Sequence, residues 1–112
     1  MCLMVARIKN MVSQHYKGKR YKREKFIEKY LGGDGKVIDS FLVNKGHKDG
    51  MERHDVTENG IIVVYNAASG KLVTKLIGRE GQLRRLYGNI GREPPKYLIE
   101  LARWHKDLGY NK

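Results

Sequence analysis

The 112-residue sequence predicts an α+β fold with helical N-terminal residues, an antiparallel meander of three to four strands and C-terminal helices. Apolar residues recur at helical spacing near the N-terminus, glycine-containing turns separate strand-like runs in the middle, and a proline pair precedes a last helical stretch. The length predicts one domain over 1–112, with a basic helical part at 1–33, a sheet at 36–78 and C-terminal helices at 79–109.

Two helices are predicted before the sheet. Helical spacing of apolar residues predicts an amphipathic helix over 3–16, marked by Met1, Met4, Val5, Ile8 and Val12. A second, short helix is predicted over 23–31, with Phe26, Ile27, Tyr30 and Leu31 facing inward. The glycine-rich stretch 32–35 ends it, because glycine accepts the left-handed conformation at a helix end.

The middle of the chain predicts the strands. Residues 36–43 are expected to form an extended segment or edge strand, with a short helix as the alternative. Strands are then predicted at 51–56, 61–65 and 71–77, separated by turns at Asn59-Gly60 and at 66–70. The run 61–65 is continuously apolar, which suits a central strand buried on both faces, although a short buried helix has the same pattern. In 71–77, Leu72, Thr74 and Leu76 are expected on one face and the alternate residues on the other.

Two helices are predicted after the sheet. The first covers 79–87, with Leu83, Leu86 and Tyr87 inward. The last begins at Pro94-Pro95, ends at Gly109 and has an apolar face of Leu98, Leu101, Ala102, His105 and Leu108. Trp104 is expected to anchor the core, and His105 to be a packing residue rather than a ligand or a base.

The charge balance predicts a polyanionic partner. Lysine and arginine number 23 against 12 acidic residues, which gives a net charge of +11. RNA, DNA and an anionic membrane are all candidates, and nucleic acid is favoured because no cationic helix has a wide apolar face. The basic run at 17–25 is either a solvated connector or a contact with phosphates, made by Lys17, Lys19, Arg20, Lys22 and Arg23.

Composition also limits the compartment and the cofactors. Cys2 is the single cysteine, so neither an internal disulfide nor a finger-type zinc site is expected. No apolar run approaches the ~20 residues that span a bilayer, and residues 2–6 are too short for the core of a secretion signal. We therefore expect a cytoplasmic protein that needs no cofactor and does not bind a membrane.

Histidines and cations near the predicted sheet indicate acid–base chemistry on a phosphate. A histidine titrates near neutrality, so one imidazole can accept a proton while another donates one. His47 and His54 would form that pair, and Lys45, Thr74 and Arg79 would hold the phosphate. On one sheet face His54 and Thr74 would lie on either side of the middle strand, about 10 Å apart.

Two other interpretations of the same residues remain open. The histidines are also typical of surface positions near bound phosphates, with no catalytic role. A metal site made from His47, Asp49, Glu52 and His54 is the second alternative, and the positive charge around these residues opposes it.

The segment 36–110 resembles small toxin-type and phage-encoded ribonuclease domains of the barnase–endoU–colicin–RelE group. The matching pieces are Gly46-His47, Glu52-Arg53-His54, 60–66, Leu72-Val73-Thr74, 78–87 and 101–105. The resemblance implies a helical N-terminal section packed on a curved antiparallel sheet. It also implies metal-independent cleavage of RNA to a 2′,3′-cyclic phosphate.

The resemblance also implies roles for single residues. His54 would be the leading acid or base and His47 its counterpart, Thr74 would orient the phosphate, and Arg79 would stabilise its charge. Tyr87 and Arg84 would hold the substrate. Toxins of this group are often paired with a protein inhibitor, which would be a second partner.

The function predicted from the sequence is RNA binding with metal-independent endoribonuclease activity. The residues expected to bind RNA are Lys45, Lys48, Arg53, Gln82, Arg84, Arg85 and Tyr87, together with the five basic residues of 17–23. One alternative is a non-catalytic nucleic-acid-binding protein, for instance a phage regulator. Another is a protein-interaction module that docks on an acidic partner.

Overall fold

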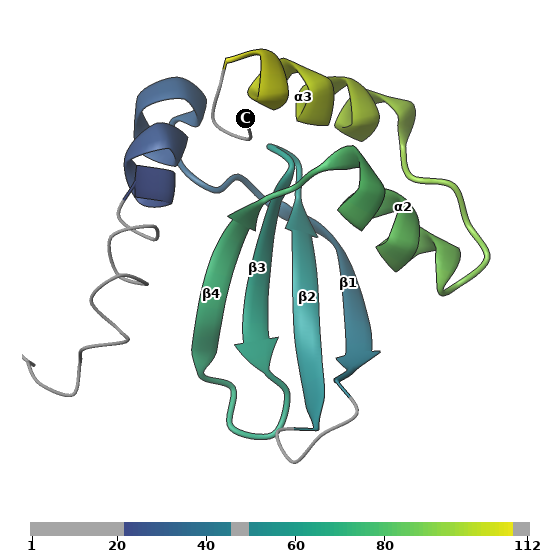
Figure 1. The fold of residues 1–112 in the computed structure, drawn as a ribbon. Coiled ribbons are helices and arrows are strands. Elements are labelled where there is room, and N and C mark those ends of the chain that lie inside the picture. The colour runs from purple at the N-terminus through teal and green to yellow at the C-terminus, as the bar shows by residue number, and fades with distance from the viewer. Residues whose placement is uncertain (1–21, 46–49, 109–112) are drawn as a thin grey trace, which may run out of the picture.

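A computed structural model describes residues 22–45 and 50–108 (Figure 1). Residues 22–26 are helical and continue into one turn of π-helix, η1 (Ile27–Leu31), and we call 22–31 the N-terminal helix. The remaining elements are β1 (Val37–Asn44), β2 (Met51–Thr57), β3 (Ile61–Asn66), β4 (Leu72–Ile77), α2 (Glu80–Gly88) and α3 (Lys96–Asp107). The predicted α+β class is confirmed. The predicted helix over 3–16 lies outside the described residues, as does Gly109, the predicted end of the last helix.

The four strands form an antiparallel meander in the order β1-β2-β3-β4. Each predicted strand is present within a residue or two of its expected bounds, and 36–43 is a strand rather than a helix. Gly60 and Gly70 have φ values of 80° and 75° in the two predicted turns. Glycine adopts that left-handed conformation without the clash that a β-carbon introduces, which is why these turns could be recognised from sequence.

The predicted alternation of β4 is wrong at Leu72. Thr74 pairs with Val64 and Leu76 pairs with Ile62, as strict alternation requires. The register then shifts between Val64 and Tyr65, so that Leu72 pairs with Tyr65. An extra residue in one strand moves every side chain beyond it to the opposite face.

Both faces of the sheet are covered around β3, and Ile61–Val64 is buried throughout. One face packs against α2 and α3, where Ile62 and Val64 belong to a cluster with Leu83, Leu86 and Leu98. The other face packs against the N-terminal helix, where Ile61, Val63 and Ile77 surround Ile27. The prediction of a central strand buried on both faces is therefore confirmed.

The N-terminal helix lies beside β4, on the left of the view in Figure 1. Its guanidinium group at Arg23 donates hydrogen bonds to the Thr74 hydroxyl and to the carbonyl of Lys75, which ties the helix to this strand. Ile27 is buried, as predicted, but Tyr30 is 46% exposed, contrary to the prediction. Residues Ile27–Leu31 form a π-helical turn that ends at Gly32, so they do not keep the 3.6-residue spacing from which the inward positions were predicted.

Helix α3 begins at Lys96, directly after the proline pair, and Pro95 is its N-cap. Leu98, Ala102 and His105 are buried as predicted. Trp104 is not a core anchor, because 44% of it is exposed. Consecutive residues of an α-helix are about 100° apart, so Trp104 lies to the side of its buried neighbour His105, on the flank of α3.

His105 is fully buried, and neither ring nitrogen has a hydrogen-bond partner among the described residues. The Phe26 ring lies edge-on at 5.9 Å, and a β-carbon on Gly60 would come within 3.4 Å of the imidazole. The side chain thus fills the junction of the N-terminal helix, the β2–β3 turn and α3, as the prediction of a packing role requires. Among the described residues, no helix is both long enough and apolar enough to cross a lipid bilayer.

Acid should destabilise this junction. Burial lowers the pKa of His105 from its usual 6.5, so the unfolded chain binds a proton more readily than the folded one. The contribution of the neutral His105 to the free energy of unfolding is fully present above pH 6.5 and is lost as pH falls through the folded-state pKa of this residue. We expect the urea midpoint to fall more between pH 7.5 and pH 5 for the wild type than for His105→Phe. Equal falls in the two proteins would contradict this.

Candidate functional site

A hollow of about 290 Å³ lies between the sheet and α2. Its polar wall consists of Asn44, Lys45, His54, Gln82, Arg85 and Asn89. Its apolar wall consists of Val43, Ile62, Leu76 and Leu86. Four residues predicted to act on RNA, namely Lys45, His54, Gln82 and Arg85, therefore come together at one place.

Local structure explains how these side chains converge. His54 pairs with Phe41 on β1 and with Val64 on β3, so its side chain points to the sheet face that α2 covers. Gln82, Arg85 and Asn89 follow one another at spacings of three and four along and just beyond α2, which places them on one side of the helix.

His54 is held by a carboxylate on its own strand. The Nε2 atom of His54 lies 3.0 Å from the Oε1 atom of Glu52, and Lys45 Nζ lies 3.8 Å from the same oxygen. Residues two apart on a strand share a face, and both side chains of the histidine–glutamate pair are about 85% buried. Because a carboxylate only accepts hydrogen bonds, Nε2 carries the proton and Nδ1 of the neutral ring is left as the basic nitrogen.

Arg85 supplies a positive charge to the same hollow. It is exposed and forms no ion pair with any carboxylate of the described residues. A guanidinium binds phosphate oxygens in a bidentate manner, and it keeps its charge at any physiological pH. The hollow therefore combines an oriented base with a cation that can receive an anionic ligand.

Thr74 lies in the same cross-strand row as His54. His54 pairs with Val64 and Val64 pairs with Thr74, which confirms the predicted placement on one face with the middle strand between them. The Thr74 hydroxyl is buried, however, and accepts a hydrogen bond of 2.9 Å from Arg23. It is not part of the wall of the hollow.

Arg79 lies at the other end of α2. Its backbone N–H donates to the side-chain oxygen of Gln82 at 2.9 Å, so that this amide caps the first turn of the helix. The Arg79 side chain lines a second hollow, of about 400 Å³, with Arg103 and Lys106. The predicted grouping of Arg79 with His54 and Thr74 around one phosphate is therefore not present.

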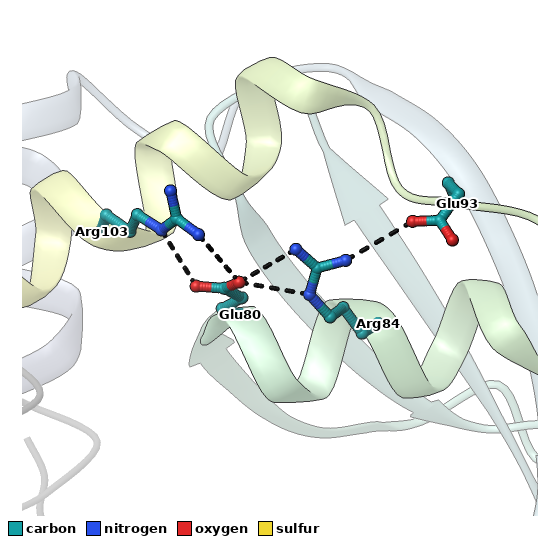
Figure 2. A network of polar contacts seen from close by, with 4 residues as sticks. All are labelled: Glu80, Arg84, Glu93 and Arg103. Carbon is teal, nitrogen blue, oxygen red and sulfur yellow. Dashed lines mark hydrogen bonds and ion pairs between the residues drawn. The ribbon is translucent and has the colours of Figure 1, made fainter.

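Arg84 belongs to a network of ion pairs between α2 and α3 (Figure 2). Its Nη2 atom lies 3.0 Å from Glu80, and its Nη1 atom lies 3.4 Å from Glu93. Arg103 binds the same Glu80 carboxylate at 3.0 Å. Hydrogen bonds from Arg103 and then Arg84 lower the pKa of Glu80, so the carboxylate stays charged and compensates both arginines.

Two further residues expected to bind RNA have other partners. Arg53 is on the opposite sheet face, with its guanidinium 4.4 Å from the Tyr65 ring centre and 3.0 Å from an Asp55 oxygen. Tyr87 is fully buried, and its hydroxyl donates to Asp39. Burial, followed by that hydrogen bond, raises the pKa of Tyr87 above its usual range.

The other predicted site residues are less informative. Lys22 is exposed and is the first described residue of the N-terminal helix. His47, Lys48, Lys17, Lys19 and Arg20 lie outside the described residues and remain predictions. No three histidine, cysteine, aspartate or glutamate side chains within 22–45 and 50–108 come together as metal ligands would.

The sequence analysis missed two polar residues of the hollow wall, Asn44 and Asn89, and the carboxylate partner of His54. Asn89 was not singled out, although its spacing from Gln82 and Arg85 is that of one helix face. Glu52 was considered only as a metal ligand, although its two-residue spacing from His54 on a strand indicates a direct contact.

Comparison with known proteins does not identify the chain: it matches no family model, no curated protein and no solved structure. Its function must therefore be argued from the chemistry of the hollow.

The buried position of Tyr87 leads to a prediction about stability. Tyr87→Phe keeps the ring that packs edge-on against Phe41 at 4.8 Å but removes the donor to Asp39. We expect a loss of about 1–2 kcal/mol in the free energy of unfolding, measured with urea, because a charged acceptor loses its partner. RNA affinity should not change, and a large loss of affinity without loss of stability would argue against the buried role.

Proposed function

We propose that this protein binds RNA at the hollow between the sheet and α2 and cleaves it without a metal ion, with His54 as the base. The observation that supports the proposal most directly is the convergence of the Glu52–His54 pair with Arg85 and Lys45. The net charge of +11 favours a polyanionic substrate. The resemblance to toxin-type and phage-encoded ribonucleases agrees with it, as does the expected cytoplasmic location.

In the proposed reaction, Nδ1 of His54 takes the proton of an RNA 2′-hydroxyl. The 2′-oxygen then forms a bond to phosphorus, and the bond from phosphorus to the 5′-oxygen breaks. The leaving oxygen takes a proton from a general acid, for which the sequence offers His47, or from water. The products are a 2′,3′-cyclic phosphate and a free 5′-hydroxyl.

The neighbouring residues have distinct parts in this scheme. Glu52 holds the imidazole in the tautomer that leaves Nδ1 basic, and it stabilises the ring once protonated. Arg85 and Lys45 face the charge that builds on the phosphate oxygens, where stabilisation contributes most to the rate. A protein inhibitor, if the chain has one, would be expected to present carboxylates to these two cations.

RNA binding without cleavage is the second candidate. The observation that favours it is that Thr74 is bound to Arg23 and that Arg79 lines a different hollow. Among the described residues, the hollow then has one histidine and no separate general acid. A binder needs only the cations.

Cleavage should depend on His54 and survive metal removal. With end-labelled RNA in EDTA, we expect the wild type to produce fragments that end in a cyclic phosphate. His54→Ala should cleave at least 100-fold more slowly, the usual effect of losing a general base. Tyr97→Ala is the control, because this exposed ring on α3 lies outside the hollow and its loss should keep wild-type activity. RNA that is bound but left intact by the wild type would establish the second candidate instead.

Neighbouring arginines should differ in their effect on RNA affinity. Arg85→Ala removes a cation that faces the hollow, whereas Arg84→Ala removes one that Glu80 and Glu93 compensate. We expect Arg85→Ala to reduce the slope of log affinity against log salt by about 0.7, the value for one phosphate contact on a single strand. Arg84→Ala should leave the slope unchanged. Equal effects would mean that binding reflects overall charge rather than this hollow.

A further inference from the structure

Four aromatic rings form a continuous row between the N-terminal helix and α3. The rings of Tyr30 and Phe26 have centres 5.0 Å apart, and the Phe26 ring meets His105 at 5.9 Å. The row ends at Trp104, whose ring centre is 5.5 Å from that of His105. We call this row the aromatic platform.

The platform is buried in its middle and open at its ends. His105 is fully buried, whereas Tyr30 is 46% exposed and Trp104 is 44% exposed. His105 and the half-buried Phe26 support the two exposed rings, so Tyr30 and Trp104 present ring surface to solvent without having to reorganise. Neither ring is needed to fill the core, which is formed on the sheet by other residues.

Positive charge lies beside the platform. The helical segment 22–31 contains four basic residues, Lys22, Arg23, Lys25 and Lys29, against two acidic ones. The ammonium group of Lys29 lies 5.3 Å from the centre of the Tyr30 ring, and Lys22, Lys25 and Lys29 are all exposed. Exposed aromatic rings next to cations are the combination that binds single-stranded nucleic acid, because bases stack on the rings and phosphates meet the cations.

We infer that the aromatic platform is a binding site for single-stranded RNA, with bases stacked on Trp104 and Tyr30 and phosphates beside the lysines of 22–31. This rests on the proposed function and specifies its substrate as unpaired RNA. A duplex hides its base faces within the helical stack and offers them nothing to stack against.

The platform is separate from the hollow that contains His54. Gly60, in the β2–β3 turn, borders the platform, since a β-carbon there would lie 3.4 Å from His105. His54 lies six residues before Gly60 in the sequence. At the rise of an extended strand, six residues span at most about 20 Å. A strand of about six nucleotides would be long enough to reach both sites, at a stacked spacing of about 3.4 Å.

Trp104 is the one tryptophan of the chain, so its fluorescence reports on the platform alone. The test uses a full-length His54→Ala background, in which the RNA stays intact, and a labelled oligouridylate of 12 nucleotides. We expect this RNA to quench Trp104 saturably, with the same midpoint as the anisotropy of the label. Removing the ring with Trp104→Ala should weaken binding roughly 5- to 140-fold, the effect of one lost base stack.

Two variants and two competitors complete the experiment. Trp104→Phe keeps a ring and should retain most of the affinity. Tyr97→Ala removes a ring of similar exposure, 45%, on the same helix but outside the platform, and should change the affinity less than twofold. A 12-base-pair RNA duplex and vesicles containing phosphatidylserine should not quench Trp104. Urea midpoints of all the variants check that they fold.

The outcomes separate the platform from the proposed function. RNA binding that is unchanged in Trp104→Ala would overturn the platform and leave the hollow as the binding site. Equal losses in Trp104→Ala and Tyr97→Ala, or equal quenching by duplex or vesicles, would also overturn it. Absence of RNA binding in every form of the protein would overturn both proposals. Quenching and binding with no cleavage by the wild type would support the platform and refute only the nuclease activity.

Discussion

The burial of β3 on both faces is the constraint on which the rest of the structure depends. Its side chains from Ile61 to Val64 are all buried, so each face of the sheet needs a helical layer. Helices α2 and α3 cover one face and the N-terminal helix covers the other. The candidate site forms where the apolar cover on the α2 side gives way to polar residues. On this face of β2, the apolar Val56 gives way to the polar His54 and Glu52. On the side of α2, the hollow is lined there by Arg85.

Ion pairs with carboxylates decide which of the many basic side chains are available to bind an anionic ligand. A net charge of +11 does not distinguish one arginine from another. Glu80 compensates Arg84 and Arg103, Asp55 compensates Arg53, and Arg23 is bound to a hydroxyl and a carbonyl on β4. Arg85 has no such carboxylate among the described residues, and it is the arginine that lies beside His54.

Local patterns explain both the successes and the errors of the sequence predictions. The turns at Gly60 and Gly70 need a left-handed residue, and the strands between them keep their bounds. The errors occur where a side chain's direction depends on distant packing. Trp104 lies one position from the buried face of α3, and Tyr30 lies in a π-helical turn that does not keep the 3.6-residue spacing. Leu72 changes face because β4 contains a register shift that no residue pattern in 71–77 indicates.

By itself, the sequence determined the α+β class, the order of the strands and the shared face of His54 and Thr74. These follow from turn chemistry and from the two-residue period of a strand, which act over a few neighbouring residues. Only the tertiary structure decided which polar groups meet: Arg85 and Asn89 near His54, Thr74 with Arg23, and Tyr87 with Asp39. Those contacts join residues up to 51 positions apart. They depend on the positions of α2 and the N-terminal helix on the sheet. Those positions are determined by close packing of side chains from separate segments.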